Sequence, residues 1–162
     1  MAKSSASSEQ DKNAPHIHNR RASFDYHILE KFEAGIALVG SEVKSIRLGR
    51  VQLGQAFAVL RGGEAFLLGC HIDEYEQANK YNHDPTRTRK LLLHRRELLR
   101  LGQRLQADKG LTLICLDMYF KRGNIKVCLA VCKGKTKGDK REAIKERDVK
   151  REMQRAVRRG GF

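Results

Sequence analysis

Two pairs of short apolar segments, each pair joined by a tight turn that contains glycine, constrain the fold of this chain most. The four segments are residues 56–60, 65–68, 111–120 and 125–131. The turns between them read Arg61-Gly62-Gly63-Glu64 and Lys121-Arg122-Gly123-Asn124. Glycine adopts the positive φ that a two-residue turn requires, so this pattern predicts two antiparallel β-hairpins.

A further strand is predicted before the first hairpin. Its apolar residues fall on even positions, which is the period of a half-buried strand. They are Phe24, Tyr26, Ile28, Phe32, Ala34, Ile36 and Leu38. Gly35 interrupts this run, and we expect a bend or a bulge there.

Two helices are predicted between the strands. Ser41 can cap a short helix that ends near Gly49, a residue suited to a left-handed C-terminal position. Residues 95–107 place Leu98, Leu101 and Leu105 at helical spacing, which predicts an amphipathic helix over a sheet. Hairpins with inserted helices favour a mainly β fold, and an OB-like antiparallel β-barrel with inserted short helices is the first choice.

The chain divides into three parts by composition. Residues 1–18 contain almost no large apolar side chain and are expected to be a disordered leader, and residues 19–132 form the barrel. Residues 133–162 carry twelve Lys or Arg against five Asp or Glu, which gives +7 in a chain whose net charge is +14. This basic C-terminal tail has too few apolar residues for a core, so we expect it to be disordered alone and helical on a partner.

The charge identifies the class of partner. A net charge of +14 and a sequence pI of about 10.0 attract polyanions, either nucleic acid or an anionic membrane. No apolar run approaches the ~20 residues of a spanning helix, and the N-terminus lacks the apolar region of a signal peptide. We therefore expect a cytoplasmic protein without membrane association.

No recognised catalytic or metal-binding motif is present. The four cysteines include no Cys-x-x-Cys pair, so neither a zinc site nor, without export, a disulfide is expected. Gly134-Lys135-Thr136 resembles the end of a phosphate-binding loop, but Leu129 stands where that loop needs glycine. Scattered carboxylates could form a Mg²⁺ site or balance nearby cations, and the second reading is favoured. The sequence therefore predicts no cofactor and no enzyme.

Basic residues cluster instead. Arg20 and Arg21 follow Asn19, and a second group lies between Pro85 and Arg96 with no acidic residue among them. The second group consists of Arg87, Arg89, Lys90, Arg95 and Arg96. Guanidinium groups bind phosphate oxygens in pairs, whereas the 6% aromatic content poorly supplies a stacking platform for unpaired bases. This balance favours folded RNA recognised by its shape and backbone.

Four ordered motifs resemble those of the small protein B family, the transfer-messenger RNA-binding proteins of bacterial trans-translation. The first two are Asn19-Arg20-Arg21-Ala22 and Phe32-Glu33-Ala34-Gly35 with the segment from Gly40 to Arg47. The others are the segment from Asp84 to Leu93 and Gly134-Lys135 with Asp139-Lys140-Arg141. The resemblance spans residues 19–155.

The resemblance implies a ribosome rescue factor with an OB-like fold. Such a factor binds the tRNA-like part of transfer-messenger RNA, delivers it to stalled ribosomes and lays its tail in the empty mRNA path, reaching the decoding centre and the mRNA channel. A translational GTPase and alanyl-tRNA synthetase, which act on the same RNA, are further candidate partners.

The basic clusters and the resemblance together give two sets of candidate residues. The expected RNA-binding residues are Asn19, Arg20, Arg21, Glu33, Arg87, Arg89, Lys90 and Leu92. The expected ribosome-contacting residues of the tail are Lys133, Lys135, Asp139, Lys140, Arg141, Val149 and Met153. For Glu33, hydrogen bonds from base amino groups and an ion pair with a neighbouring lysine are equally weighted alternatives.

Two residues depart from the family pattern. Gly138 stands where members often carry a larger ring-bearing residue, which removes base stacking at this position. Cys115 replaces a common proline, and we expect this change to be neutral for packing. A ribosomal structural or assembly protein and an RNA-processing enzyme are the rival functions.

Overall fold

The computed structural model describes residues 14–160 as a small β-barrel with peripheral helices. The strands are β1 Ile17–His18, β2 Tyr26–Ile36, β3 Val51–Gln52, β4 Phe57–Arg61, β5 Glu64–Leu68, β6 His71–Ile72, β7 Arg89–Leu92, β8 Leu111–Lys121 and β9 Asn124–Gly134. The helices are α2 Ala22–Asp25, α3 Gly40–Arg47, α4 Arg95–Ala107 and α5 Lys137–Gly160, with a 3₁₀ helix η1 at Glu76–Tyr81. These elements confirm the predicted mainly β class.

The strand pairings close into a ring. The sheet runs β1-β8-β4-β5-β7-β2-β9, and β9 also pairs with β8, so the last strand returns to the second. All of these pairs are antiparallel, and β3 and β6 form a separate two-stranded sheet. Closure leaves few unpaired backbone groups at sheet edges. The result is a small antiparallel barrel, in keeping with the OB-like prediction.

Both predicted hairpins are present. Arg61 pairs with Glu64 across the first turn, and Lys121 pairs with Asn124 across the second. The two central residues of each turn have positive φ, which is the type I′ geometry that suits the twist of paired strands. In the second turn a non-glycine residue, Arg122, adopts a φ of 52°.

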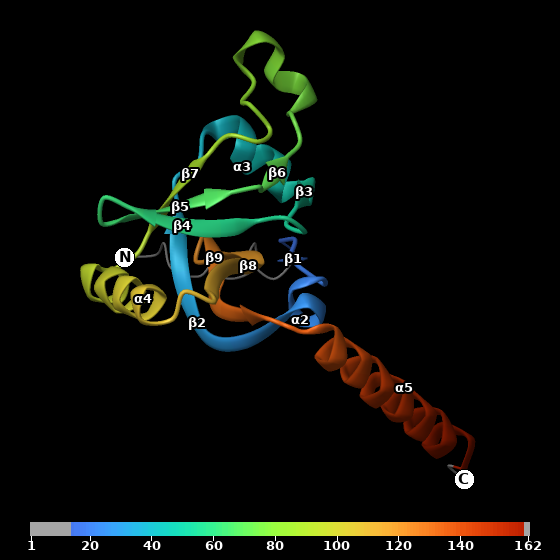
Figure 1. Ribbon diagram of the computed structural model, residues 1–162. Coiled ribbons are helices and arrows are strands. Elements are labelled where there is room, and N and C mark those ends of the chain that lie inside the picture. The colour runs from blue at the N-terminus through green and yellow to red at the C-terminus, as the bar shows by residue number, and fades with distance from the viewer. Residues whose placement is uncertain (1–13, 161–162) are drawn as a thin grey trace, which may run out of the picture.

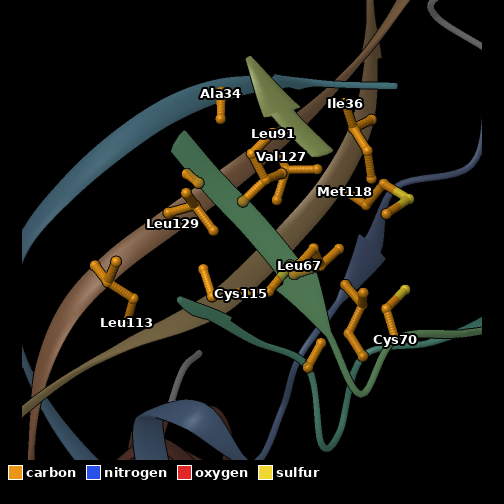
Figure 2. Packing of buried hydrophobic residues seen from close by; sticks show 14 of the residues in the cluster. Ala34, Ile36, Leu67, Cys70, Leu91, Leu113, Cys115, Met118, Val127 and Leu129 are labelled. Carbon is orange, nitrogen blue, oxygen red and sulfur yellow. The ribbon is translucent and has the colours of Figure 1, made fainter. Parts of the chain in front are cut away.

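The barrel interior is filled by alternate residues of the long strands (Figure 2). Leu113 and Cys115 of β8 point into this core, and Ile114 and Leu116 point to the other face. There they pack with Ala22 of α2 in a second, smaller cluster. Both faces of β8 are therefore covered near α2, which fixes the N-terminal segment to the barrel.

The first long strand follows the predicted alternation only in part. Phe32, Ala34 and Ile36 are buried, but Phe24 lies in α2 and Ile28 is exposed. The register shift falls between Ile28 and Glu30, not at Gly35 as predicted. At Gly35 an added Cβ would lie 3.2 Å from the Cβ of Leu92, so glycine permits the close approach of β7.

The short helix α3 starts two residues earlier than predicted. Val39 occupies the N-cap position, and its backbone N–H donates to the carboxylate of Glu42. The hydroxyl of Ser41, the predicted cap, instead contacts His83 Nδ1. Gly49 has a φ of 71°, so the predicted left-handed helix end is confirmed.

The predicted amphipathic helix is confirmed with its predicted bounds, Arg95–Ala107. Leu101 is fully buried, and Leu98 and Leu105 are partly buried against the barrel core. The helix caps one end of the barrel through this single face.

The two ends of the chain differ from the predicted divisions. The leader predicted over residues 1–18 is too long, because Ile17 and His18 pair with Met118 and Asp117 of β8. The rest of the predicted leader, residues 1–13, lies outside the described residues. The tail predicted from Lys133 begins inside β9, which ends at Gly134. Beyond it α5 projects away from the barrel, at the end opposite the loop that carries η1 (Figure 1). Its dependence on a partner for order stays a prediction.

Candidate nucleic-acid interface

Asn19, the first expected RNA-binding residue, is buried, and both polar atoms of its side chain form hydrogen bonds within the protein. Its amide nitrogen donates to the carbonyls of Leu53 at 2.8 Å and Cys115 at 3.0 Å. Its oxygen accepts the backbone N–H groups of Arg21 and Ala22. Asn19 therefore joins α2 to the barrel, and a direct RNA contact would compete with four hydrogen bonds.

Cys115 lies in the irregular part of β8, where the register shifts before Asp117. Its backbone N–H donates to the carbonyl of Ala56 at 3.2 Å. Proline at this position would lose that bond, so cysteine adds one link between β8 and the segment before β4.

Arg20 and Arg21 are exposed beside Asn19. Arg21 has 74% of its side chain exposed and lies 3.9 Å from Asp25. A surface hollow of about 320 Å³ next to it is lined by the side chains of Tyr26 and Phe57, among others. A cation beside aromatic walls can receive a phosphate and an unstacked base together.

Glu33 lies on the outer face of β2 with two partners from β8. Its carboxylate accepts a 2.6 Å hydrogen bond from the Tyr119 hydroxyl and pairs with Lys121 Nζ at 2.8 Å. Hydrogen bonds from Lys121 and then Tyr119 lower the pKa of Glu33, with a smaller contribution from Lys126. The predicted ion pair with a lysine is thus present, and a base contact stays a prediction.

We call Glu33, Tyr119, Lys121 and Lys126 the outer-sheet patch. Sequence reasoning missed Tyr119, Lys121 and Lys126. Tyr119 pairs with Lys126 in the second hairpin, and β9 pairs in turn with β2, so Tyr119 and Lys121 reach Glu33 across β9. Extending the hairpin register outward from its turn predicts the first pairing, whereas the pairing of β9 with β2 joins distant segments.

Glu42 is the centre of a buried ion-pair cluster. Its carboxylate has no exposed surface and pairs with Arg89 at 2.7 Å and with Arg87 at 2.6 Å. Arg87 binds both carboxylate oxygens, the fork geometry in which guanidinium is strongest. Burial raises the pKa of Glu42, but the hydrogen bonds from Arg87, Val39 and Arg89 outweigh it and hold the pKa below its usual range. We call Glu42, Arg87 and Arg89 the Glu42 cluster.

Arg89 is completely enclosed, which differs from its expected role. Beyond Glu42, its guanidinium donates to the backbone carbonyls of Cys70, Arg87 and Pro85. With no exposed surface it cannot touch a phosphate unless this cluster opens. Arg89 instead ties α3, the strand β7 and the loop before it into one unit, and Arg87 is half-buried in the same unit.

Lys90 and Leu92 alternate with these buried residues and point outward. Lys90 Nζ pairs with Glu64 of β5, and both side chains are about half exposed. Leu92 has 53% of its surface exposed and lies against Gly35 of β2. This exposure places Leu92 outside the core, and its contact with RNA stays a prediction.

The first turn of α5 is fastened to the barrel. Lys140 Nζ pairs with Asp25 at 2.8 Å and lies 5.8 Å from the ring centre of Phe24. Asp139 accepts the backbone N–H of Thr136, which caps the helix, and it also contacts His27. The hydrogen bond from Lys140 lowers the pKa of Asp25, and the bonds from Thr136 lower that of Asp139.

The remaining tail residues are more open. Lys135 Nζ donates to the Ser23 carbonyl, and Lys133 lies 3.5 Å from Asp108. Arg141, Val149 and Met153 are exposed on α5, as is Gly138, where an added Cβ would meet only Thr136. The expected tail residues therefore divide into an anchored first turn and a free helix.

No helix within residues 14–160 is long and apolar enough to cross a membrane. No group of three or more His, Cys, Asp or Glu among these residues could hold a metal ion.

Known proteins resemble this chain over most of its length. The family described as "SmpB protein" matches residues 16–159. The SsrA-binding protein of Carboxydothermus hydrogenoformans is 54% identical over 140 residues, covering 86% of this chain and 93% of the relative. That of Symbiobacterium thermophilum is 53% identical over 145 residues, covering 89% and 91%. A chain of the solved structure "tmRNA-SmpB: a journey to the center of the bacterial ribosome" is 48% identical with a TM-score of 0.65, covering 81% of this chain and 95% of that one. The chain therefore belongs to the SmpB family.

Proposed function

We propose that this protein binds the tRNA-like part of transfer-messenger RNA and delivers it to stalled ribosomes for trans-translation. The names of its relatives, SsrA-binding protein and tmRNA-SmpB on the ribosome, support this function. It acts in the cytoplasm by binding, without catalysis. A translational GTPase and alanyl-tRNA synthetase act on the same RNA.

The observation that carries the proposal is the separation of two basic regions in space. The barrel exposes Arg20, Arg21, Lys90 and the outer-sheet patch, whereas α5 projects away from it (Figure 1). A helix of this length extends by about 36 Å at 1.5 Å per residue. One part can hold a folded RNA while the other reaches into a separate channel.

The barrel surface supports RNA recognition by backbone and shape. Lys121 lies beside Glu33, and Lys90 lies on the same strand as the exposed Leu92, so cations stand next to a polar and an apolar side chain. Folded RNA displays phosphates and 2′-hydroxyls that such a surface can read. We propose that the tail occupies the empty mRNA path, with Asp139, Lys140 and Arg141 near the decoding centre.

An RNA pull-down with sequencing tests this function. The tagged protein should recover one dominant RNA of tRNA-like character, and a charge-reversed variant, Lys121→Glu with Lys126→Glu, should recover less of it. Recovery of ribosomal RNA at fixed stoichiometry from resting subunits would favour a ribosomal structural protein. Loss of function on substitution of a histidine, with RNA recovery unchanged, would favour an RNA-processing enzyme.

A further inference from the structure

The helix α5 carries two chemically different stripes. Residues three or four positions apart lie on one face of a helix. One such series is Asp139, Glu142, Glu146, Val149, Met153 and Val157, which we call the acidic-apolar stripe. Its first half is anionic and its second half is apolar, and Lys150, four residues after Glu146, borders it on one side.

The opposite side of α5 is basic. The series Lys140, Ile144, Arg147, Arg151, Arg155 and Arg158 follows the same spacing, and we call its five cations the basic stripe. Ile144, which is 44% exposed, is the one apolar residue in this series. Lys140 and Arg147 lie over the ring of Phe24, at 5.8 Å and 6.0 Å from its centre. Contacts with α2 thus fix the rotation of the helix, so that the two stripes face different surroundings.

The acidic-apolar stripe is largely uncovered in the described chain. Val149, Met153 and Val157 are 50%, 64% and 74% exposed. Glu142 and Glu146 are also exposed, and neither forms an ion pair with another residue in the range 14–160. A surface of this kind gains most from a partner that offers cations and apolar groups together.

RNA is a poor occupant for this stripe. Phosphates repel the carboxylates of Glu142 and Glu146, and RNA presents little apolar surface to three aliphatic side chains. The basic stripe has the opposite preference, because its guanidinium groups bind phosphates. A second copy of α5 is also disfavoured, because each chain carries a net charge of +14.

We infer that the acidic-apolar stripe binds a basic protein surface of the ribosome, while the basic stripe faces ribosomal RNA. This inference rests on the proposed function, since it names the wall of the channel that each side of the tail contacts. The protein side supplies Lys or Arg opposite Glu142 and Glu146, and apolar side chains opposite Val149, Met153 and Val157.

Charge reversal separates a protein partner from an RNA partner by the sign of the effect. Glu146→Lys should weaken binding of the protein with transfer-messenger RNA to stalled ribosomes by at least about threefold, because it opposes a basic protein. Asp148→Lys, two residues away toward the basic stripe, should leave that binding unchanged or tighten it. Tighter binding by Glu146→Lys would overturn the inference, since an RNA wall would attract the new cation.

Photo-crosslinking identifies the contacted molecule directly. A benzophenone amino acid replaces Met153 in one variant and Arg151 in the other, and both are bound with transfer-messenger RNA to purified stalled ribosomes. The Met153 variant should give a crosslink to ribosomal protein that resists ribonuclease, and the Arg151 variant a crosslink to ribosomal RNA. A Met153 crosslink to RNA, to the barrel or to a second copy, or none at all, would overturn the inference.

Co-sedimentation of the same complexes keeps the two proposals distinguishable. If the variants sediment with stalled ribosomes but Met153 contacts RNA, only the assignment of the stripes fails. If the wild-type protein with transfer-messenger RNA does not sediment with stalled ribosomes, the proposed function fails and the inference falls with it.

Discussion

Two arginine-rich regions of this molecule look alike in sequence and behave differently in the structure. In the segment before and within β7, Arg87 and Arg89 are turned inward onto Glu42. In α5, Arg141, Arg147 and Arg151 remain on the surface. A carboxylate on another element, 45 to 47 residues away in sequence, makes the difference.

This comparison shows that the role of a cation cluster, structural or RNA-binding, can be assigned only once its counter-charges are known. A buried arginine is retained because a buried carboxylate and backbone carbonyls satisfy it. The alternation of β7 then leaves Lys90 and Leu92 as the outward residues of the same strand. The segment therefore contributes to stability with one set of residues and to contact with the other.

Removing the carboxylate of the Glu42 cluster should have the largest effect. Glu42→Gln leaves Arg89 buried without its counter-charge and should lower the free energy of unfolding by about 3–5 kcal/mol. Glu64→Gln, which breaks the exposed pair with Lys90, is the matched control and should cost about 0–1 kcal/mol. Chemical denaturation measures both, and equal small losses would show that the cluster does not hold the barrel together.

The Glu42 cluster should also make the free energy of unfolding depend on pH in the acidic range. Because the folded-state pKa of Glu42 is lowered, its contribution is present above its unfolded pKa of about 4.3 and is lost as pH falls through the folded value. The wild type should therefore lose more stability than Glu42→Gln on acidification below pH 4.3. Parallel curves for the two proteins would contradict this assignment.

Leu92→Asp tests whether the outward face of β7 contributes to RNA affinity rather than to stability. The exposed side chain should change the free energy of unfolding by about 0.5 kcal/mol or less, while affinity for transfer-messenger RNA falls. Leu99→Asp on α4 is a matched control, since Leu99 is 59% exposed and lies on another surface. Circular dichroism beside a binding titration measures both, and a large drop in melting temperature for Leu92→Asp would place this residue in the core.

Lys90→Ala should give the smallest effect. Loss of one phosphate contact lowers the slope of log affinity against log salt by about 0.7–0.9. Folding should be unaffected, because the pair with Glu64 is half exposed. RNA titrations at several salt concentrations measure this slope, with Lys109→Ala as the control. Equal slopes for Lys90→Ala and Lys109→Ala would refute the phosphate contact of Lys90.

Local patterns predicted the parts of the fold that depend on neighbours in sequence. The two glycine turns, the helix Arg95–Ala107 and the left-handed Gly49 are set by turn chemistry and helical spacing. The bulge near Ile28, the close approach at Gly35 and the burial of Arg89 depend on distant strands or on Glu42. No local pattern contains that information, so RNA-facing and structural residues were grouped together.

The anchoring of the tail shows the same limit. Asp139 and Lys140 were expected to act on the ribosome, yet here they contact His27 and Asp25 of the barrel. The capping of α5 by Asp139 is a local pattern, whereas its contact with β2 is not. Contact with the ribosome would replace these surface ion pairs by contacts with the partner, and each surface pair costs little to break.

Deletion of residues 137–162 tests the division between barrel and tail most directly. The cut leaves β9 whole, because Gly134 still pairs with Tyr26. The shortened protein should remain folded and keep most of its affinity for transfer-messenger RNA, but it should fail to support peptide tagging on ribosomes stalled without a stop codon. Wild-type tagging, or a collapse of RNA affinity with the barrel intact, would contradict the account.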